Sequence, residues 1–264
     1  MLWTLWRHTV VKMSDLAAIT YNLNRVRELV RAAADCRSQE LQQAFPIPRL
    51  VAVSKTKPKE CIIQAYKDGQ QHFGENYVQE LVDKASDPQL QQECSDVKFH
   101  FIGHLQKNKI SKLLSVVEKL FVVETIDSEG LAQNLNDACE RRGITERLNI
   151  MVQVNTSGES TKSGVPPESC GKLVQYIGER CPKLNFLGLM TIGAYEHDHE
   201  PNKDFIMLSD IRTKICNELN MKISAVELSM GMSADYEEAI QLGSSNVRVG
   251  SIIFGPRLPP PTSS

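Results

Sequence analysis

The sequence contains no run of apolar residues long enough to cross a bilayer, no C-x-x-C pair and no excess of either charge. A membrane helix needs about 20 consecutive apolar residues, so we expect no membrane contact. A net charge of −2 gives no general attraction to nucleic acid. The seven cysteines are odd in number and widely scattered. They argue against a disulfide scaffold or a thiolate zinc site, and for reduced thiols in a cytosol-like compartment.

The composition is that of an ordinary globular protein, since 41% of the 264 residues are hydrophobic and 23% are charged. We expect an N-terminal extension over residues 1–13, a folded domain over 14–255, and a disordered proline-rich tail over 256–264. The extension is basic, like an organelle-targeting segment, but it is not rich in serine and arginine as such segments are. We therefore expect a non-structural extension and a cytoplasmic protein, with a mitochondrial fraction as the alternative.

The folded part begins with a helical pattern and continues with short strands. Behind an N-cap candidate, Ser14 or Asp15, apolar residues recur at helical steps; they are Leu16, Ile19, Leu23, Val26 and Val30. Eight β-branched runs with amphipathic stretches between them follow, at 49–54, 71–74, 98–103, 119–124, 148–154, 185–191, 223–228 and 246–249. This order predicts an α/β protein, a single (β/α)8 TIM barrel with an extra N-terminal helix.

An open, doubly wound sheet is the competing fold. Such a sheet normally carries a glycine-rich nucleotide-binding loop after its first strand. Here "SKTKP", residues 54–58, stands in that place. The barrel is therefore favoured, and its active site is expected at the carboxyl ends of the strands.

Two basic residues are expected at those carboxyl ends. Lys55 continues the alternation of Val51 and Val53 at the end of the first strand, and Arg248 alternates with valines in the eighth. Barrel closure makes these two strands neighbours. Two cations at one mouth would each be costly to desolvate unless an anion joins them. A phosphorylated ligand would serve.

The last two loops carry residues that suit a phosphate. "ELSMGMSADYEEAI" offers Gly231 for a tight turn with Ser229 and Ser233 as hydroxyl groups, and the eighth strand is followed by Gly250 and Ser251. A phosphate site between the loops after strands seven and eight recurs in such barrels. The alternative is that these are ordinary glycine turns and serine caps.

Three further polar motifs are weighed in the same way. Asn76, after the second strand, either faces the mouth or caps the following helix. His100 and His104 would be about 13 Å apart in a strand, so we expect no metal pair, although His104 remains a candidate beside a ligand. The histidine-rich and acidic "YEHDHE", residues 195–200, is expected to be solvated loop.

Six motifs in order resemble the successive signatures of the pyridoxal 5′-phosphate homeostasis protein family, also called proline synthetase co-transcribed homologues. They are "LVAVSKTKP", "FGENYVQE", "HFIGHLQKNK", "GLMTIG", "ELSMGMSADY" and "VRVGSIIFG", between Arg49 and Gly255. The resemblance implies a fold-type III barrel, similar to the N-terminal domain of alanine racemase, that holds pyridoxal phosphate as an internal aldimine. Lys55 matches the aldimine position. Lys57 is the rival, but it lies beyond the strand beside Pro58, where a solvated loop is expected.

The resemblance also implies how the cofactor is held. Asn76 would lie near the polar edge of the ring, and Arg248 would face the pyridine nitrogen. The phosphate would be surrounded by Ser229, Gly231, Met232, Ser233, Gly250 and Ser251, with Thr191 nearby. The chain departs from many relatives in reading "FGPRLPPPTSS" where they continue "FG-x-R-x-Y", which leaves the packing of the closing segment open. It also carries Ile252 where a small or polar residue is common, and we expect little effect on binding.

The implied function is buffering or delivery of pyridoxal phosphate, without robust catalysis. A racemase needs acid–base groups on both faces of its substrate, and the related racemases take one from a C-terminal β-rich domain for which we expect no room here. The alternative is a small amino-acid racemase or decarboxylase that uses His104 or Tyr77. Expected partners of the monomer are pyridoxal phosphate-dependent apo-enzymes or a vitamin B6 kinase or oxidase.

Overall fold

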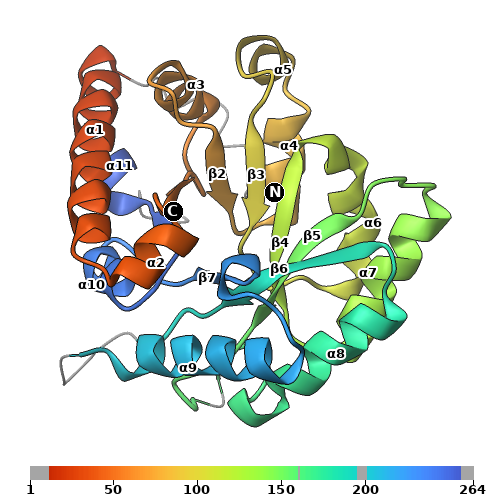
Figure 1. The fold of residues 1–264 in the computed structure, drawn as a ribbon. Coiled ribbons are helices and arrows are strands. Elements are labelled where there is room, and N and C mark those ends of the chain that lie inside the picture. The colour runs from red at the N-terminus through yellow and green to blue at the C-terminus, as the bar shows by residue number, and fades with distance from the viewer. Residues whose placement is uncertain (1–11, 160, 195–200, 257–264) are drawn as a thin grey trace.

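The computed structural model describes residues 12–159, 161–194 and 201–256. Eight parallel strands form a closed barrel in chain order (Figure 1), with β1 paired to β8. The predicted barrel is confirmed. The predicted loop at 195–200 lies outside the described residues, as do residues 1–11 of the extension and 257–264 of the tail. The strands are β1 (Arg49–Val53), β2 (His72–Glu75), β3 (Lys98–Phe101), β4 (Leu120–Ile126), β5 (Leu148–Gln153), β6 (Leu184–Met190), β7 (Glu227–Ser229) and β8 (Asn246–Val249).

Helical segments follow every strand and cover the outside of the barrel (Figure 1). Several of them start with a side-chain cap; for example, Ser128 Oγ accepts from the Leu131 N–H and Asn202 Oδ1 from the Asp204 N–H. The helices after β1 to β8 are α3 (Lys59–Lys67), α4 (Val78–Ala85) with α5 (Pro88–Glu93), α6 (Ile110–Leu113), α7 (Glu129–Arg141), α8 (Cys170–Arg180), α9 (Lys203–Glu218), α10 (Tyr236–Gln241) and α11 (Ser251–Phe254), and α2 (Gln39–Ala44) precedes β1.

Helix α1 (Met13–Asp35) is the predicted N-terminal helix and lies along the seam where the barrel closes, beside α10 and α11 (Figure 1). Four of its predicted apolar positions are buried: Ile19, Leu23, Val26 and Val30. The predicted N-cap is wrong, because the cap position is Lys12. Asp15 stands three residues further on, and its carboxylate accepts a hydrogen bond from the Lys12 N–H at 3.4 Å. The acidic residue therefore belongs to the first turn.

Strand β7 is shorter than predicted and begins later. Residues 223–225 form a 3-10 turn, in which the Ala225 N–H donates to Lys222 O and the Val226 N–H to Ile223 O. These backbone bonds use groups that a strand would offer to its neighbour, so pairing with β6 begins only at Glu227. Within this run Val226 is buried and Ile223 is half-buried, whereas Ser224 and Ala225 are exposed, so the run does not form a longer buried strand.

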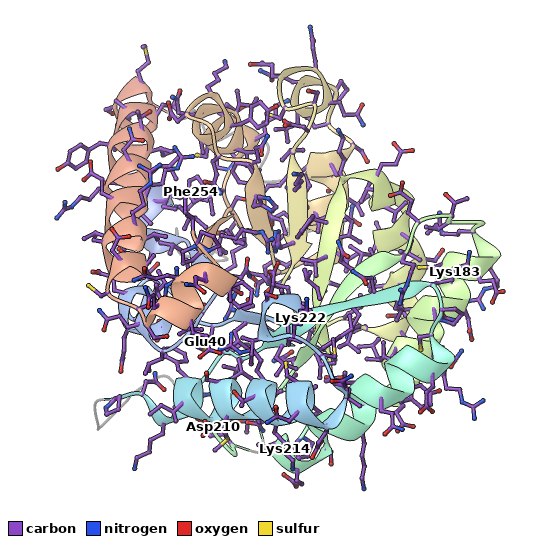
Figure 2. The ribbon with its side chains drawn as sticks, in the orientation of Figure 1. Glu40, Lys183, Asp210, Lys214, Lys222 and Phe254 are labelled. Atoms are coloured by element: carbon purple, nitrogen blue, oxygen red, sulfur yellow. The ribbon has the colours of Figure 1, made fainter. Side chains whose placement is uncertain are left out.

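The main core lies between the barrel and its helices, and the outer faces of the helices are polar. Figure 2 shows Asp210 and Lys214 along α9 at the edge of the molecule, where both are exposed. Within the described ranges, every helix is too short or too polar to cross a bilayer. A second, smaller apolar cluster of Val122, Met151 and Met190 is separate from this main core, and the barrel strands also carry buried polar side chains such as His100 and Glu124.

Candidate functional site

The predicted site residues lie at or next to the carboxyl ends of the strands. Lys55 follows β1, Asn76 follows β2, His104 comes three residues after β3, and Thr191 follows β6. The remaining ones belong to the ends of β7 and β8 and the loops after them. The barrel therefore brings every predicted residue to one end, which is the end that carries active sites in this fold.

Lys55 is half-buried and lies between the two groups of residues predicted to contact a ligand. Because Val53 pairs with Gly74 in parallel strands, Lys55 stands at the level of Asn76. On the other side of β1, a Cβ atom on Gly250 would lie 3.2 Å from Val53 O, so the loop after β8 passes close to the strand end. Lys55 is thus flanked by Asn76 and by the loop that starts at Gly250.

Lys57 occupies a different place. Its Nζ donates to Pro256 O at 2.8 Å, at the end of the described chain. Lys57 is half-buried rather than fully solvated, and burial lowers the pKa of its amine. Lys57 is therefore a chemically credible competitor of Lys55 for an aldehyde, and the two must be separated by experiment.

The loops after β7 and β8 are joined to each other. The Arg248 N–H donates to Gly231 O at 3.0 Å, and the Gly250 N–H donates to Ser233 Oγ at 3.3 Å. Gly231 has a φ of +93°, and a Cβ atom there would lie 2.5 Å from the Ala239 Cβ. Only glycine fits this turn without displacing α10. Met232 is half-buried in the same loop, and Ser251 is exposed at the start of α11.

Arg248 lies inside the barrel and is neutralised there. Its Nη1 donates to Ser229 Oγ at 2.6 Å and its Nη2 to Thr191 O at 2.8 Å. Ser229 Oγ in turn donates to Glu124 Oε2 at 2.6 Å. Since β4 and β7 are not neighbours, this bond crosses the interior. The Glu124 carboxylate therefore supplies a buried counter-charge for Arg248. From the sequence, this counter-charge was expected only from a ligand.

The hydrogen-bond chain continues from Glu124 toward the amino ends of the strands. His100 Nδ1 lies 2.6 Å from Glu124 Oε1, and His100 Nε2 lies 2.8 Å from His72 Nδ1. Burial lowers the pKa of His72 to about 2 and also lowers the pKa of His100, so both rings are neutral at pH 7. Burial by itself would raise the pKa of Glu124, but the interactions with His100, Arg248 and Ser229 together lower it below its ordinary value, and the carboxyl is ionised. These partners assign both imidazole protons to Nδ1.

Two of the residues predicted near the phosphate use their hydroxyl groups elsewhere. Ser229 is fully buried, gives its one proton to Glu124 and accepts from Arg248. Thr191 is buried as well, and its Oγ1 donates to Val154 O at 3.0 Å. Their hydroxyl protons are therefore not available to a phosphate. We assign both residues to holding the Arg248 guanidinium in place instead.

Asn76 is not a helix cap. The cap position of α4 is Tyr77, and no side chain caps it. Asn76 Oδ1 is buried and has no hydrogen-bond partner among the described residues. The loop after β3 passes so close that a Cβ atom on Gly103 would lie 1.9 Å from Asn76 O. A buried amide oxygen without a donor is a group that a bound ligand can satisfy.

His100 in β3 and His104 after it lie in separate environments. His100 is enclosed in the barrel, whereas His104 is exposed at the mouth, with its Nδ1 3.8 Å from Asp127 Oδ2 and 3.4 Å from Ser163 Oγ. Across the described residues, no cluster of three potential ligands could hold a metal ion. A contact between His104 and a bound ligand stays a prediction.

A buried charged cluster lies behind the turn after β1, between β1, β2 and α4. Lys84 Nζ donates to Glu75 Oε1 at 2.7 Å, to Glu80 Oε1 at 2.8 Å and to Ser54 O at 2.8 Å. The Ser54 hydroxyl also donates to Glu75 Oε1 at 2.6 Å. This cluster was not predicted from the sequence. Its signal was present, since Glu80 and Lys84 fall on the buried side of α4 together with Leu81.

The cluster gives a pH-dependent prediction. Burial raises the pKa of Glu75 from 4.5 to about 7, although the Lys84 ammonium opposes this. The folded protein then binds more protons than the unfolded chain between these values, so stability falls as the pH rises through this window. We expect Glu75→Gln to show no such fall in stability with rising pH. Its free energy of unfolding in urea, relative to wild type, should rise by up to about 3 kcal/mol between about pH 5 and pH 8.

The same titration contains its own control. Glu93 is on the surface of α5, and Glu93→Gln should show no such gain because its pKa is lowered by Lys67. If the difference between wild type and Glu75→Gln is equal at both pH values, the Glu75 carboxyl is ionised throughout and the predicted window does not exist.

Comparison with known proteins agrees with this geometry. Residues 14–258 match the family described as "Alanine racemase, N-terminal domain". The pyridoxal phosphate homeostasis protein of Homo sapiens is 49% identical over 255 residues, which are 96% of this chain and 91% of that protein. The chain belongs to the pyridoxal phosphate homeostasis protein family. The member from Schizosaccharomyces pombe is 46% identical over 79% of this chain and 84% of its own length.

Solved structures place the family on the same barrel. PipY of Synechococcus elongatus, determined with pyridoxal phosphate bound, has a TM-score of 0.73 at 27% identity, over 90% of this chain and 100% of that chain. An alanine racemase of Clostridium difficile has a TM-score of 0.62 at 15% identity, and this chain spans 59% of its length. The racemase comparison shows a shared fold, and membership of the homeostasis family explains the order of the sequence motifs.

Proposed function

We propose that this protein binds pyridoxal 5′-phosphate as a Schiff base on Lys55 and serves in intracellular vitamin B6 homeostasis by buffering or delivering the cofactor. The observation that carries the proposal is the common level of Lys55 and Asn76 beside the glycine loop at Gly250. Family members that bear the homeostasis name, and PipY with the cofactor bound, support it.

The residues of the mouth suit the parts of this cofactor. Asn76 Oδ1 offers an unpartnered acceptor at the ring edge. Arg248 can only donate, so it suits an unprotonated pyridine nitrogen. Gly231 gives the backbone room to approach a phosphate, and Ser233 and Ser251 add hydroxyl groups. When bound, the cofactor supplies an aldehyde for condensation with an amine and an electron-withdrawing ring.

We infer little catalysis from the same residues. An unprotonated pyridine nitrogen makes the ring a weaker electron sink than a pyridinium, which a carboxylate partner would favour. Glu124 is a buried carboxylate, but it is hydrogen-bonded to Ser229 and His100 and is thereby separated from the mouth. His104 and Tyr77 are exposed rather than enclosed, so neither lies in the water-excluded environment that favours proton transfer at a substrate carbon. A carrier is thus favoured over a racemase or decarboxylase.

Two measurements on the purified protein test this function. Added pyridoxal phosphate should give a visible absorbance band that survives dialysis and is bleached by borohydride. Exchange of the α-proton in a panel of L-amino acids should then be far slower than the roughly 1–10³ s⁻¹ of typical enzymes. A turnover within that range would establish the racemase or decarboxylase alternative, and failure to retain the cofactor would refute the proposal.

The finer parts of the proposal concern partners and place. We infer that the protein acts in the cytoplasm as a monomer and exchanges cofactor with pyridoxal phosphate-dependent apo-enzymes or with a vitamin B6 kinase or oxidase. Fractionation of cells expressing versions that start at Met1 or at Met13 tests the location. A mitochondrial pool found only with the longer version would show that residues 1–12 are a targeting segment.

A further inference from the structure

The turn that carries Lys55 contains a strained residue. Thr56 has a φ of +63°, and only one other non-glycine residue in the described part of the chain has a positive φ. A β-branched side chain is disfavoured in this conformation. The Thr56 hydroxyl cannot hold it, since Oγ1 is buried and has no partner among the described residues. Something else must keep the backbone in this shape.

The buried cluster behind β1 holds the turn on both sides of Lys55. On the C-terminal side of Lys55, the Thr56 N–H donates to Glu80 Oε1 at 2.6 Å. On the N-terminal side of Lys55, Ser54 O accepts from Lys84 Nζ at 2.8 Å, and the Ser54 hydroxyl donates to the Glu75 carboxylate. The Lys57 N–H closes the turn by donating to Ser54 O at 3.0 Å. The backbone of Lys55 is thus fixed through its two neighbours.

The cluster is a costly way to fill this space. Two carboxylates face a single ammonium, and Glu75 Oε2 and Glu80 Oε2 are both buried without a partner among the described residues. Apolar side chains of similar volume would avoid the desolvation of three ionisable groups. Costly arrangements of this kind are kept where they shape a functional site. The cluster also lies on the outer side of β1, so it cannot itself contact a ligand in the mouth.

We infer that Glu80 and Lys84, together with Glu75, are positioning residues that preorganise Lys55 for condensation with an aldehyde. This inference rests on the proposed function. In the condensation, the neutral Lys55 Nζ adds to the aldehyde carbon and a C=N bond forms. The carbonyl oxygen leaves as water with the two protons of the amine. A fixed backbone lowers the entropy lost in reaching this geometry. The cluster therefore strengthens covalent capture but not docking of the ring and phosphate.

Two ligands separate these effects. Pyridoxine 5′-phosphate carries an alcohol in place of the aldehyde, so it docks without condensing. In wild type, pyridoxal phosphate should bind more tightly than this alcohol. In Glu80→Ala that preference should fall about tenfold or more, the factor expected for one charge-assisted hydrogen bond, while the affinity for the alcohol stays within about twofold. Glu80→Gln retains an oxygen for the Thr56 N–H and should keep most of the preference.

Two more variants control for a purely structural role. Asp83→Ala removes an exposed carboxylate from the same helix and should change neither affinity. Thr56→Gly relieves the strained φ without changing any charge, so it should fold as well as wild type yet lose part of the preference as the turn loosens. Unchanged preference in Glu80→Ala, or equal weakening of both ligands, would overturn the positioning role. Equal affinities in wild type would instead refute capture by a lysine, and with it the proposed function.

Discussion

Replacement of Lys55 by alanine is expected to abolish the visible absorbance band that pyridoxal phosphate gives with the wild-type protein. The band requires a C=N bond, and Lys55 is the lysine placed between Asn76 and the loop after β8. Lys57→Ala should keep the band, because the Lys57 amine is held at Pro256 O. Absorbance spectra of the dialysed variants check both statements.

Peptide mapping makes this prediction sharper. Borohydride reduction of the wild-type complex should leave the phosphopyridoxyl group on the peptide that contains Lys55. The burial that lowers the pKa of Lys57 makes that residue a real competitor. A label found mainly on Lys57 would show that the wrong lysine has been assigned, even if the function itself is right.

Gly231→Val should produce the second large effect, a loss of both stability and cofactor affinity. The new Cβ would meet the Ala239 Cβ at 2.5 Å and the Tyr236 backbone at 3.0 Å, at a φ of +93°. Overpacking and backbone strain each cost about 1–3 kcal/mol, so we expect about 2–6 kcal/mol lost in urea unfolding. Since Gly231 O also accepts from the Arg248 N–H, affinity should fall at least about 100-fold.

Two variants separate the local effect from general destabilisation. Gly143 also has a positive φ, +66°, but nothing lies within 4 Å of a Cβ atom built there, and it precedes β5 at the opposite end of the barrel. Gly143→Val should lose stability and keep affinity. Ser251→Ala removes one hydroxyl from the mouth and should weaken binding only about tenfold. If Gly231→Val keeps wild-type affinity, the phosphate is held elsewhere.

The sequence was sufficient for the barrel because that fold depends on a repeated local pattern. Each β-branched run predicts a strand, and the amphipathic stretch after it predicts a helix. The start of β7 was predicted too early, at residue 223, but this did not change the order of the strands and helices. Lys55 and Arg248 were placed at the mouth for the same reason, since alternation along a strand tells which side a residue takes.

Hydrogen-bond partners on opposite strands of the closed barrel could not be predicted from the pattern of a single strand. Ser229 was expected near a phosphate, yet its proton goes to Glu124, which is 105 positions away along the chain. Only barrel closure brings those two strands face to face. The Lys84 cluster was missed for a different reason. A helix that carries charged residues is usually predicted to expose them to solvent. Here α4 instead packs Glu80 and Lys84 against the turn after β1.

Helix α1 and its place at the barrel seam have a consequence for synthesis on the ribosome. Helix α1 packs against α3, which is made early, and against α10 and α11, and the Asn22 side chain donates to Ile253 O at 3.3 Å. About 200 residues separate Asp35 from Tyr236, so at roughly 5–20 residues per second the helix waits some 10–40 s for α10 and α11 to be made. A chain that stalls before β8 has α1 covered only in part, by α3, and leaves one edge of β1 unpaired. Such a nascent chain exposes apolar surface and an unpaired strand edge, which are the features that make folding intermediates prone to aggregation.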